Sequence, residues 1–345
     1  MLGAQAVLHR SVQAMRAFVT GGSGFVGRHL LTALKVRGTP ARALARSAAA
    51  RASVTEAGGE PFEGDLSDVE KLKAGMEGCD TVFHCAAVVK GWGARSEFYE
   101  TNVRGTERVL EAARAAGVKR LVHVSTEAVL ADGSPLERVD ETMPLPERPI
   151  GDYPSTKGEA ERRVLSVNAP DFVTVVVRPR FIWGAGDTSL LPQFQEAVRT
   201  GRFRWFGGGR YLTSTCHVAN CVEGMLLAAE KGRGGEAYFL TDGEPVEFRG
   251  FITAMLATQG VDAGERTLPY GVAATVASVG DLLWGTFGLG GRPPLTRTEV
   301  LLMGREVTVR DDKARRELGY EGRRSREEGL REMKAEHQDT ASRML

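Results

Sequence analysis

A glycine-rich octapeptide near the start of the chain limits the possible fold more than any other feature. Residues 20–27 read T-G-G-S-G-F-V-G and lie between an apolar run at 17–19 and a helix-like segment at 28–37. Counted from Gly22 the glycines follow G-x-G-x-x-G, and counted from Gly21 they follow G-x-x-G-x-x-G. Glycines at a strand-to-helix turn let the backbone approach a phosphate, whose charge the helix N-terminus stabilises. The segment therefore predicts a dinucleotide-binding site.

The first half of the chain alternates apolar, β-branched runs with helical patterns. Strands are expected at 17–20, 41–45, 81–85, 120–125 and 173–178, and helices at 25–37, 67–76, 96–116 and 153–168. This alternation is typical of an α/β fold with a Rossmann-type, doubly wound parallel sheet. After residue 180 the pattern is irregular, with helices at 217–230 and 248–258 and a strand near 237–241, which favours a smaller C-terminal substrate-binding lobe.

These patterns suggest four parts. We expect a disordered extension at 1–14, with Met15 as an alternative start, and an NAD(P)-binding Rossmann domain at 15–180. A substrate-binding lobe at 181–330 would be interleaved with that core, and a charged, solvated helical tail would follow at 331–345.

Composition argues against several classes of protein. The 45 Lys and Arg residues balance 44 Asp and Glu residues, so there is no electrostatic case for a nucleic-acid partner. The four cysteines form no C-x-x-C motif and have no matching histidine spacing. We therefore expect no metal site, and a reducing cytoplasm as the compartment. Residues 1–15 lack the apolar core and cleavage site of a secretory signal.

The end of the second expected strand bears on the choice of cofactor. NAD sites usually place an acidic residue there, whereas an arginine accommodates the 2′-phosphate of NADP. The strand ends Ala45-Arg46-Ser47, without an acid. The sequence favours NADP over NAD, and the alternative is that Arg46 is simply solvated.

An apolar stretch at 268–289 is interrupted by several glycines and by Asp281. These interruptions argue against a membrane-spanning helix. Three interpretations stay open: a helical lid over an apolar substrate, a segment that makes peripheral contact with a membrane, or core packing with no functional role.

Tyr153 and Lys157 form the pattern Y-x-x-x-K. Four residues apart on a helix, both side chains lie on one face. A nearby ammonium favours the phenolate. It therefore lowers the pKa of the phenol toward the range in which it can act as a general acid/base. A hydroxyl pair, Ser125-Thr126, follows the fourth strand, at the end where ligands of open α/β sheets bind. We expect these four residues to be catalytic.

The order of motifs resembles that of the extended short-chain dehydrogenases/reductases. The motifs, which span about residues 15–330, are Thr20–Gly27, Gly64-Asp65-Leu66, His84-Cys85-Ala86-Ala87, Asn102-Val103-Arg104-Gly105-Thr106, Val124-Ser125-Thr126, Tyr153-x-x-x-Lys157 and the run from Arg178 to Gly184. Within that superfamily the chain looks most like the 3β-hydroxysteroid dehydrogenase-like branch, on residues such as Lys90–Gly93, Ile182–Asp187 and His217–Asn220.

The resemblance implies a role for each matching residue. The cofactor would be bound by Gly21, Ser23, Gly24, Phe25, Val26, Gly27 and Arg46, by Asp65 and Leu66 at the adenine, by Ala86 and Ala87, and by Lys157 and Pro179 at the nicotinamide end. Thr126 aligns with the family's catalytic hydroxyl, with Ser125 beside it, and Asn102 would support the site. Leu130, in place of a frequent tyrosine, and Arg46 both argue against a strictly steroid-specific enzyme.

The implied activity is an NAD(P)-dependent oxidoreductase that interconverts a hydrophobic secondary alcohol and a ketone, of the 3β-hydroxysteroid or β-keto acid type. The alternative is a nucleotide-sugar epimerase or dehydratase. However, residues 211–217 lack the Arg-Asp pair that such relatives carry before the His-Val motif. A non-catalytic nucleotide sensor is the third hypothesis, and the intact Tyr153, Lys157 and Thr126 argue against it. A homodimer is the expected assembly.

Overall fold

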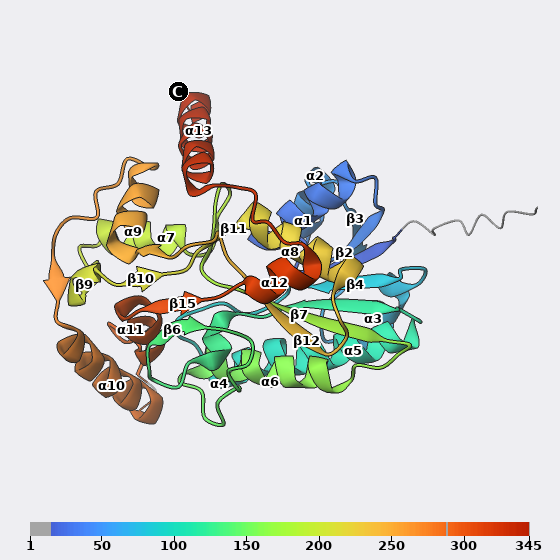
Figure 1. Cartoon of the computed structure of the whole chain (residues 1–345), viewed down its shortest axis with the longest axis horizontal. Helices are drawn as coiled ribbons and strands as arrows, with labels where there is room; N and C mark the ends of the chain where they lie inside the picture. Colours follow the sequence, from blue (N-terminus) through green and yellow to red (C-terminus); the bar gives the residue numbers. More distant parts are fainter. Residues whose placement is uncertain (1–14, 288, 345) are drawn as a thin grey trace, which may run out of the picture.

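The computed structural model describes residues 15–287 and 289–344. The expected extension at 1–14 lies outside the described residues. The described chain forms a nucleotide-binding part around one large sheet and a smaller part that carries the remaining sheets (Figure 1).

The large sheet has seven parallel strands in the order β12-β7-β5-β4-β1-β2-β3. Their bounds are β1 Ala17–Thr20, β2 Ala41–Ala45, β3 Glu60–Glu63, β4 Thr81–His84, β5 Arg120–Val124, β7 Val173–Pro179 and β12 Glu236–Leu240. The central strands are buried along their length because helices cover both faces of the sheet. The predicted doubly wound fold is confirmed, and β3 is a strand that the sequence patterns did not reveal.

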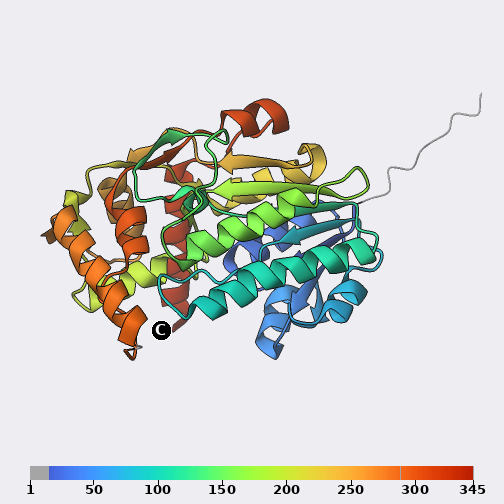
Figure 2. The same cartoon turned by 90° about the horizontal axis from the view of Figure 1, so that it is seen from below.

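Helices pack on the two faces as separate groups. One face is covered by α1 Phe25–Val36, α2 Ala48–Glu56, α8 Val218–Lys231 and α12 Asp312–Leu318. The other is covered by α3 Val69–Met76, α5 Gly105–Ala115 and α6 Asp152–Ser166, with α5 and α6 lying side by side (Figure 2). The helix expected at 96–116 comprises α4 Arg95–Phe98, a π-helical turn at Tyr99–Arg104 and α5.

The chain changes direction in the sheet between β1 and β4. From β1 the sheet continues to β2 and β3 on one side, and through β4 to β5, β7 and β12 on the other. A crevice forms at such a switch point, outside the carboxyl ends of the strands, and ligands bind there.

The smaller part has its own sheets and a separate aromatic core. A four-stranded sheet has the order β13-β10-β15-β6, and two pairs join β8 with β11 and β9 with β14. The strands are β6 Leu136–Val139, β8 Ile182–Trp183, β9 Trp205–Phe206, β10 Leu212–Thr213, β11 Cys216–His217, β13 Val246–Glu247, β14 Thr267–Leu268 and β15 Val307–Val309. The helices are α7 Leu191–Arg199, α9 Phe248–Ala257, α10 Tyr270–Phe287, α11 Arg297–Gly304 and α13 Arg326–Met344, with 3-10 turns at Glu127–Leu130 and Gly207–Gly209.

The chain passes between the two parts more often than the sequence patterns suggested. The helix and strand expected at 217–230 and 237–241 were assigned to the lobe, but α8 packs on the large sheet and β12 forms its edge. Apolar residues that pack against the large sheet explain this placement, since Met225 and Tyr238 are both fully buried there. The tail is helical, as expected, yet it is not wholly solvated, because Met333 is buried in the core of the lobe.

The apolar stretch forms α10, which lies beside α11 at the outer side of the lobe (Figure 1). Only its small residues Ala273, Ala277 and Gly280 are fully buried. Among the described residues, no helix is both long enough and apolar enough to cross a membrane.

Candidate active site

The glycine loop is shaped as a phosphate cradle. The Gly24 amide donates to the Gly21 carbonyl at 3.0 Å, which closes the turn between β1 and α1. A Cβ atom on Gly27 would lie 2.1 Å from the Gly21 oxygen, so only glycine fits there. Helix α1 has no side-chain N-cap, which leaves its first amides free for an anion. These features fit a dinucleotide pyrophosphate.

The residues expected at the adenosine end lie at the ends of neighbouring strands. Arg46 is exposed immediately after β2, next to Ser47, which caps α2. Asp65 follows β3 and is also exposed, while Leu66 is partly buried against the core. Arg42, the other arginine of this strand, donates to the Gly75 carbonyl and faces Glu60. Arg46 is therefore better placed than Arg42 to meet an added phosphate.

Helix α6 carries Tyr153 and Lys157 toward the carboxyl end of β5. The Lys157 ammonium donates to the Val124 carbonyl at 2.7 Å and lies 3.2 Å from Nε2 of His123. Burial lowers the pKa of Lys157 to about 8, against the opposing charge of Glu161. Burial also raises the pKa of Tyr153, as does the nearby Glu127 carboxylate, while the Thr126 hydroxyl lowers it.

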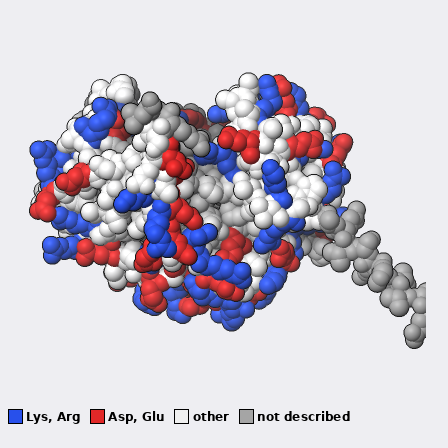
Figure 3. All heavy atoms as spheres, turned by 90° about the horizontal axis from the view of Figure 1, so that it is seen from above, with Lys and Arg blue, Asp and Glu red and all other residues white. Residues whose placement is uncertain are grey.

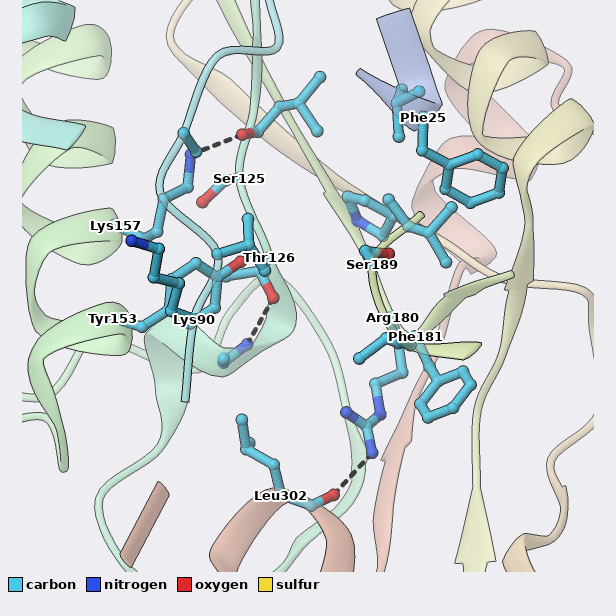
Figure 4. Close-up of a pocket in the computed structure, with 18 of the residues that line it drawn as sticks. Phe25, Lys90, Ser125, Thr126, Tyr153, Lys157, Arg180, Phe181, Ser189 and Leu302 are labelled. Carbon is cyan, nitrogen blue, oxygen red and sulfur yellow. Dashed lines mark hydrogen bonds between the residues drawn. The ribbon is translucent and has the colours of Figure 1, made fainter. Parts of the chain in front are cut away.

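The two hydroxyls after β5 have different partners. Ser125 donates to Glu161 at 2.6 Å, and Glu161 is paired with the guanidinium of Arg178. Thr126 donates to Glu127 at 2.8 Å, and its oxygen accepts from the Ala128 amide at 3.2 Å. Figure 4 shows Ser125 and Thr126 on the same side of the pocket as Tyr153 and Lys157. Of the two hydroxyls, Thr126 is the one that affects the pKa of Tyr153.

Asn102 connects the loop after β4 to helix α6. Its amide oxygen accepts from the Val88 amide at 2.8 Å, and its nitrogen donates to Thr156 of α6 at 3.1 Å. The π-helical turn places Asn102 at this junction. His84, whose pKa burial lowers to about 3, links Thr20 of β1 to Thr106 of α5. The network holds loop, sheet and helix together.

The side chains expected to be catalytic line a cavity that has two chambers. The inner chamber, about 320 Å³, reaches from the glycine loop past Tyr153 to α11. The outer chamber, about 590 Å³, lies between α7, the segment 202–206 and the segment 292–295. Both chambers share a border of residues, namely Ala87, Val89, Thr188, Ser189, Leu190, Gln193, Glu299 and Met303. In a space-filling view a hollow separates the two halves of the molecule (Figure 3).

Most expected site residues gather at this cavity. Those that line the inner chamber are Gly21, Gly24, Phe25, Val26, Gly27, Ala87, Ser125, Thr126, Tyr153, Lys157 and Pro179. Ser23, Arg46, Asp65, Leu66 and Ala86 are not in its lining. A lid formed by α10 is not observed, because no residue of α10 lines either chamber. The segment 293–295 intervenes, with Pro293 and Leu295 against Gly280.

Sequence reasoning missed Glu127 and Arg180, which form a buried ion pair at 2.8 Å in the wall of the inner chamber. Both residues lie at recognised motifs. Glu127 directly follows Thr126, and Arg180 lies within the motif at 178–184. The walls contributed by α7 and α11 were also missed, because no motif marks them.

The fold and site define the class of protein: an NAD(P)-dependent short-chain dehydrogenase/reductase of the extended type. The sequence profile of the 3-beta hydroxysteroid dehydrogenase/isomerase family matches residues 18–270. A 4-hydroxy-2-methyl-3-oxo-4-farnesyl-3,4-dihydroquinoline-1-oxide ketoreductase from Stigmatella aurantiaca is 58% identical over 92% of this chain and 95% of its own length. A 2-alkyl-3-oxoalkanoate reductase from Stenotrophomonas maltophilia is 35% identical over 93% of this chain and 99% of its own.

Among solved structures, gox2253 superposes with a TM-score of 0.77 and 29% identity, covering 94% of this chain and 98% of its own. The chain belongs to the 3-beta hydroxysteroid dehydrogenase/isomerase family. It is an oxidoreductase that acts on the CH–OH group of hydrophobic substrates and interconverts alcohol and ketone, as the sequence predicted.

Proposed function

We propose that the protein is a ketoreductase for a bulky 3-oxo compound, with a prenylated 3-oxo-dihydroquinoline N-oxide as its first candidate substrate. The observation that carries this proposal is the two-chambered cavity with Tyr153 and Thr126 in one wall. The outer chamber offers Leu190, Phe194 and Phe203 to a hydrocarbon tail. The relative with 58% identity bears the name of a ketoreductase for such a farnesylated ketone.

The side chains have complementary tasks in the proposed reduction. Bound nicotinamide cofactor supplies the hydride. Tyr153 donates its phenolic proton to the ketone oxygen, and Thr126 lies beside it in the lining of the inner chamber. The Lys157 ammonium stabilises the phenolate that remains and, by the family pattern, binds the nicotinamide ribose. We propose Pro179 and Ala87 as the walls on either side of that end of the cofactor.

A substrate screen tests this function. Oxidation of NADPH would be followed with the farnesylated quinoline N-oxide, a 2-alkyl-3-oxoalkanoate and a 3-oxosteroid. We expect the highest kcat/KM with the first, and little turnover of Tyr153→Phe, whose affinity for NADPH should remain unchanged. If UDP-glucose were epimerised and no ketone were reduced, the nucleotide-sugar alternative would replace the proposal.

We propose NADP as the preferred cofactor, with Arg46 as the residue that binds its 2′-phosphate. The exposed position of Arg46 after β2, beside the N-terminus of α2, supports this role. A charge-assisted contact of this kind contributes about 1.5–3 kcal/mol. Arg46→Asp should shift the NADP/NAD ratio of kcat/KM toward NAD by about tenfold or more. Arg51→Asp, which removes an exposed arginine paired with Glu63, is the control and should leave the ratio unchanged.

The remaining proposals concern surroundings and assembly. We propose that the apolar face of α10 contacts a membrane surface, on the support of its exposed Val272, Val276, Val279 and Phe287. A homodimer is proposed from the family resemblance and can be measured by analytical ultracentrifugation. A cytoplasmic location is proposed from the four cysteines, all of which are free thiols.

A further inference from the structure

A buried histidine lies beside the ammonium group of Lys157. Nζ of Lys157 lies 3.2 Å from Nε2 of His123 and donates to the Val124 carbonyl at 2.7 Å. The exposed fractions of His123 and Lys157 are only 0% and 2%. Nδ1 of His123 is also buried, and it has no hydrogen-bond partner among residues 15–287 and 289–344. A buried polar atom without a partner is unfavourable and therefore needs a physical reason.

A second buried histidine, His84, has partners on both sides of its ring. The centre of that ring lies 5.1 Å from the centre of the His123 ring. Thr106 donates its hydrogen to the Asn102 carbonyl at 2.6 Å, so it accepts from Nε2 of His84, 2.8 Å away. Nδ1 of His84 then accepts from the Thr20 hydroxyl at 2.7 Å. Because both nitrogens of His84 are hydrogen-bonded, the fold alone explains this residue.

The contact with Lys157 determines which nitrogen of His123 carries the hydrogen. An ammonium group only donates, so Nε2 of His123 accepts and the single ring hydrogen lies on Nδ1. Protonation of both nitrogens is unfavourable, because burial and the charge of Lys157 hold the pKa of His123 well below its ordinary value. The unpaired Nδ1 is thus a consequence of the hydrogen bond that Nε2 accepts from Lys157.

The ammonium group of Lys157 has three hydrogens, and groups of β5 accept two of them. One goes to the Val124 carbonyl and one to His123. The angles between the three N–H bonds are fixed, so two occupied directions determine the third. Lys157 lines the inner chamber together with Tyr153 and the glycine loop. The third hydrogen is therefore the one that can serve a ligand in this chamber.

We propose that His123 is a positioning residue, which accepts one hydrogen of the Lys157 ammonium and, together with the Val124 carbonyl, directs the remaining hydrogen to the inner chamber. The ammonium is thereby held in one orientation for the nicotinamide ribose and for the phenolate of Tyr153. The catalytic meaning of this inference rests on the function proposed above, whereas the hydrogen bond itself can be measured without cofactor or substrate.

The titratable and charged groups around Lys157 come from four elements. They are Tyr153 and Glu161 on α6, His84 and Cys85 at the end of β4, His123 on β5, and Arg178 on β7, which is paired with Glu161. Burial raises the pKa values of Tyr153 and Cys85 and lowers those of both histidines, so these four groups are neutral near neutral pH. Burial lowers the pKa of Lys157 to about 8, so in that range Lys157 is the group that changes its charge.

NMR of the full-length protein without cofactor tests the hydrogen bond. In protein with ¹⁵N-labelled histidine rings, assigned through bonds to the backbone, the nitrogen shifts distinguish a protonated nitrogen from an accepting one. We expect Nδ1 of His123 to be protonated and Nε2 to be an acceptor. The Nε2 signal should change with a midpoint at about pH 8, where Lys157 loses its charge, although His123 itself stays neutral.

Lys157→Met removes the donor and is the control for this titration. The Nε2 signal of His123 should then stay constant through the same pH range. A hydrogen on Nε2 in the parent protein, or an equal titration in Lys157→Met, would overturn the proposal. The measurement needs no substitution at His123, so it is decisive even if variants at that position fail to fold.

Cofactor binding and turnover provide a second readout. His123→Leu removes the acceptor, whereas His123→Gln retains one in its amide oxygen. In His123→Leu we expect about tenfold weaker binding of NADPH by fluorescence titration. With the 2-alkyl-3-oxoalkanoate as substrate, the alkaline limit of ketone reduction should lie about one pH unit lower, because loss of an acceptor disfavours the ammonium. His123→Gln should restore both properties.

A structural role alone would give a different result. Loss of thermal stability in His123→Leu, with an unchanged alkaline limit, would contradict a positioning role. A parent enzyme that reduces no ketone would refute the proposed function, whereas the NMR titration would still decide the role of His123.

Discussion

Two buried glutamates give the adjacent hydroxyls after β5 different roles. Ser125 donates to Glu161, which is paired with Arg178, whereas Thr126 donates to Glu127, whose charge raises the pKa of Tyr153. Because Ser125 and Thr126 both carry a hydroxyl, the residue type does not show which of them takes part in the reaction. Their different glutamate partners distinguish the two.

This division predicts different outcomes for two alanine variants. Thr126→Ala should lower kcat by about a hundredfold, equivalent to about 2.7 kcal/mol of transition-state stabilisation. Ser125→Ala should keep kcat within about threefold of the parent but lower the free energy of unfolding by about 1–3 kcal/mol, since Glu161 loses a donor. Steady-state kinetics and urea denaturation measure both. A larger loss of kcat in Ser125→Ala than in Thr126→Ala would reverse the assignment.

Lys157 should determine the alkaline limit of activity. Burial lowers its pKa to about 8, so the ammonium is present below that pH and is lost as pH rises through it. Ketone reduction should therefore decline above pH about 8. In Lys157→Arg the guanidinium stays protonated throughout this range, so a slower enzyme without that decline is expected. Measuring kcat against pH for both proteins, at saturating NADPH, provides the test.

At the scale of single elements, α10 has two apolar faces and only one of them is covered. Ala273, Ala277 and Gly280 are buried, whereas Val272, Val276, Val279, Leu283 and Phe287 are exposed. The exposed residues recur at spacings of three and four, so they form a stripe along one side of the helix. Asp281 is the sole charged residue of α10, and it accepts from the Arg297 amide. Such a stripe is typical of a surface that meets an apolar environment.

Vesicle binding tests this face directly. Val276→Ser/Val279→Ser should weaken co-sedimentation with phosphatidylcholine/phosphatidylglycerol vesicles by about tenfold, without loss of thermal stability. Val36→Ser, which changes an isolated and 83% exposed valine on α1, should bind as the parent does. If the parent itself fails to bind vesicles, but self-associates with increasing concentration, the face is a contact between copies.

At the scale of the whole molecule, the nucleotide-binding part is completed by chain from beyond residue 180. β12 pairs with β7 at the sheet edge, and α8 covers β5 and β7. A fragment of residues 15–180 would expose the β7 edge and buried valines such as Val175 and Val177. We expect that fragment to lack cooperative thermal unfolding by circular dichroism, whereas residues 15–345 unfold cooperatively. A cooperative transition in the fragment would show that the Rossmann part is independent.

Local patterns in the sequence were sufficient for much of the fold and for the chemistry of the site. The glycine loop, the alternation of strands and helices and the Y-x-x-x-K spacing depend on contacts within a few residues, such as the close approach of Gly27 to Gly21. Short strands without β-branched runs, such as β3, and the membership of α8 and β12 in the large sheet were not accessible, because distant packing decides them.

The sequence by itself determined the fold class and the glycine-rich turn, because local patterns of consecutive residues encode both. Only the tertiary structure decided which glutamate each hydroxyl after β5 meets, since Glu127 and Glu161 are held by arginines more than fifteen residues away. It also decided that α10 lies outside the cavity wall and that α7 and α11 bound the substrate chambers. These features arise where segments remote in the sequence pack together, and a local sequence pattern does not reveal such packing.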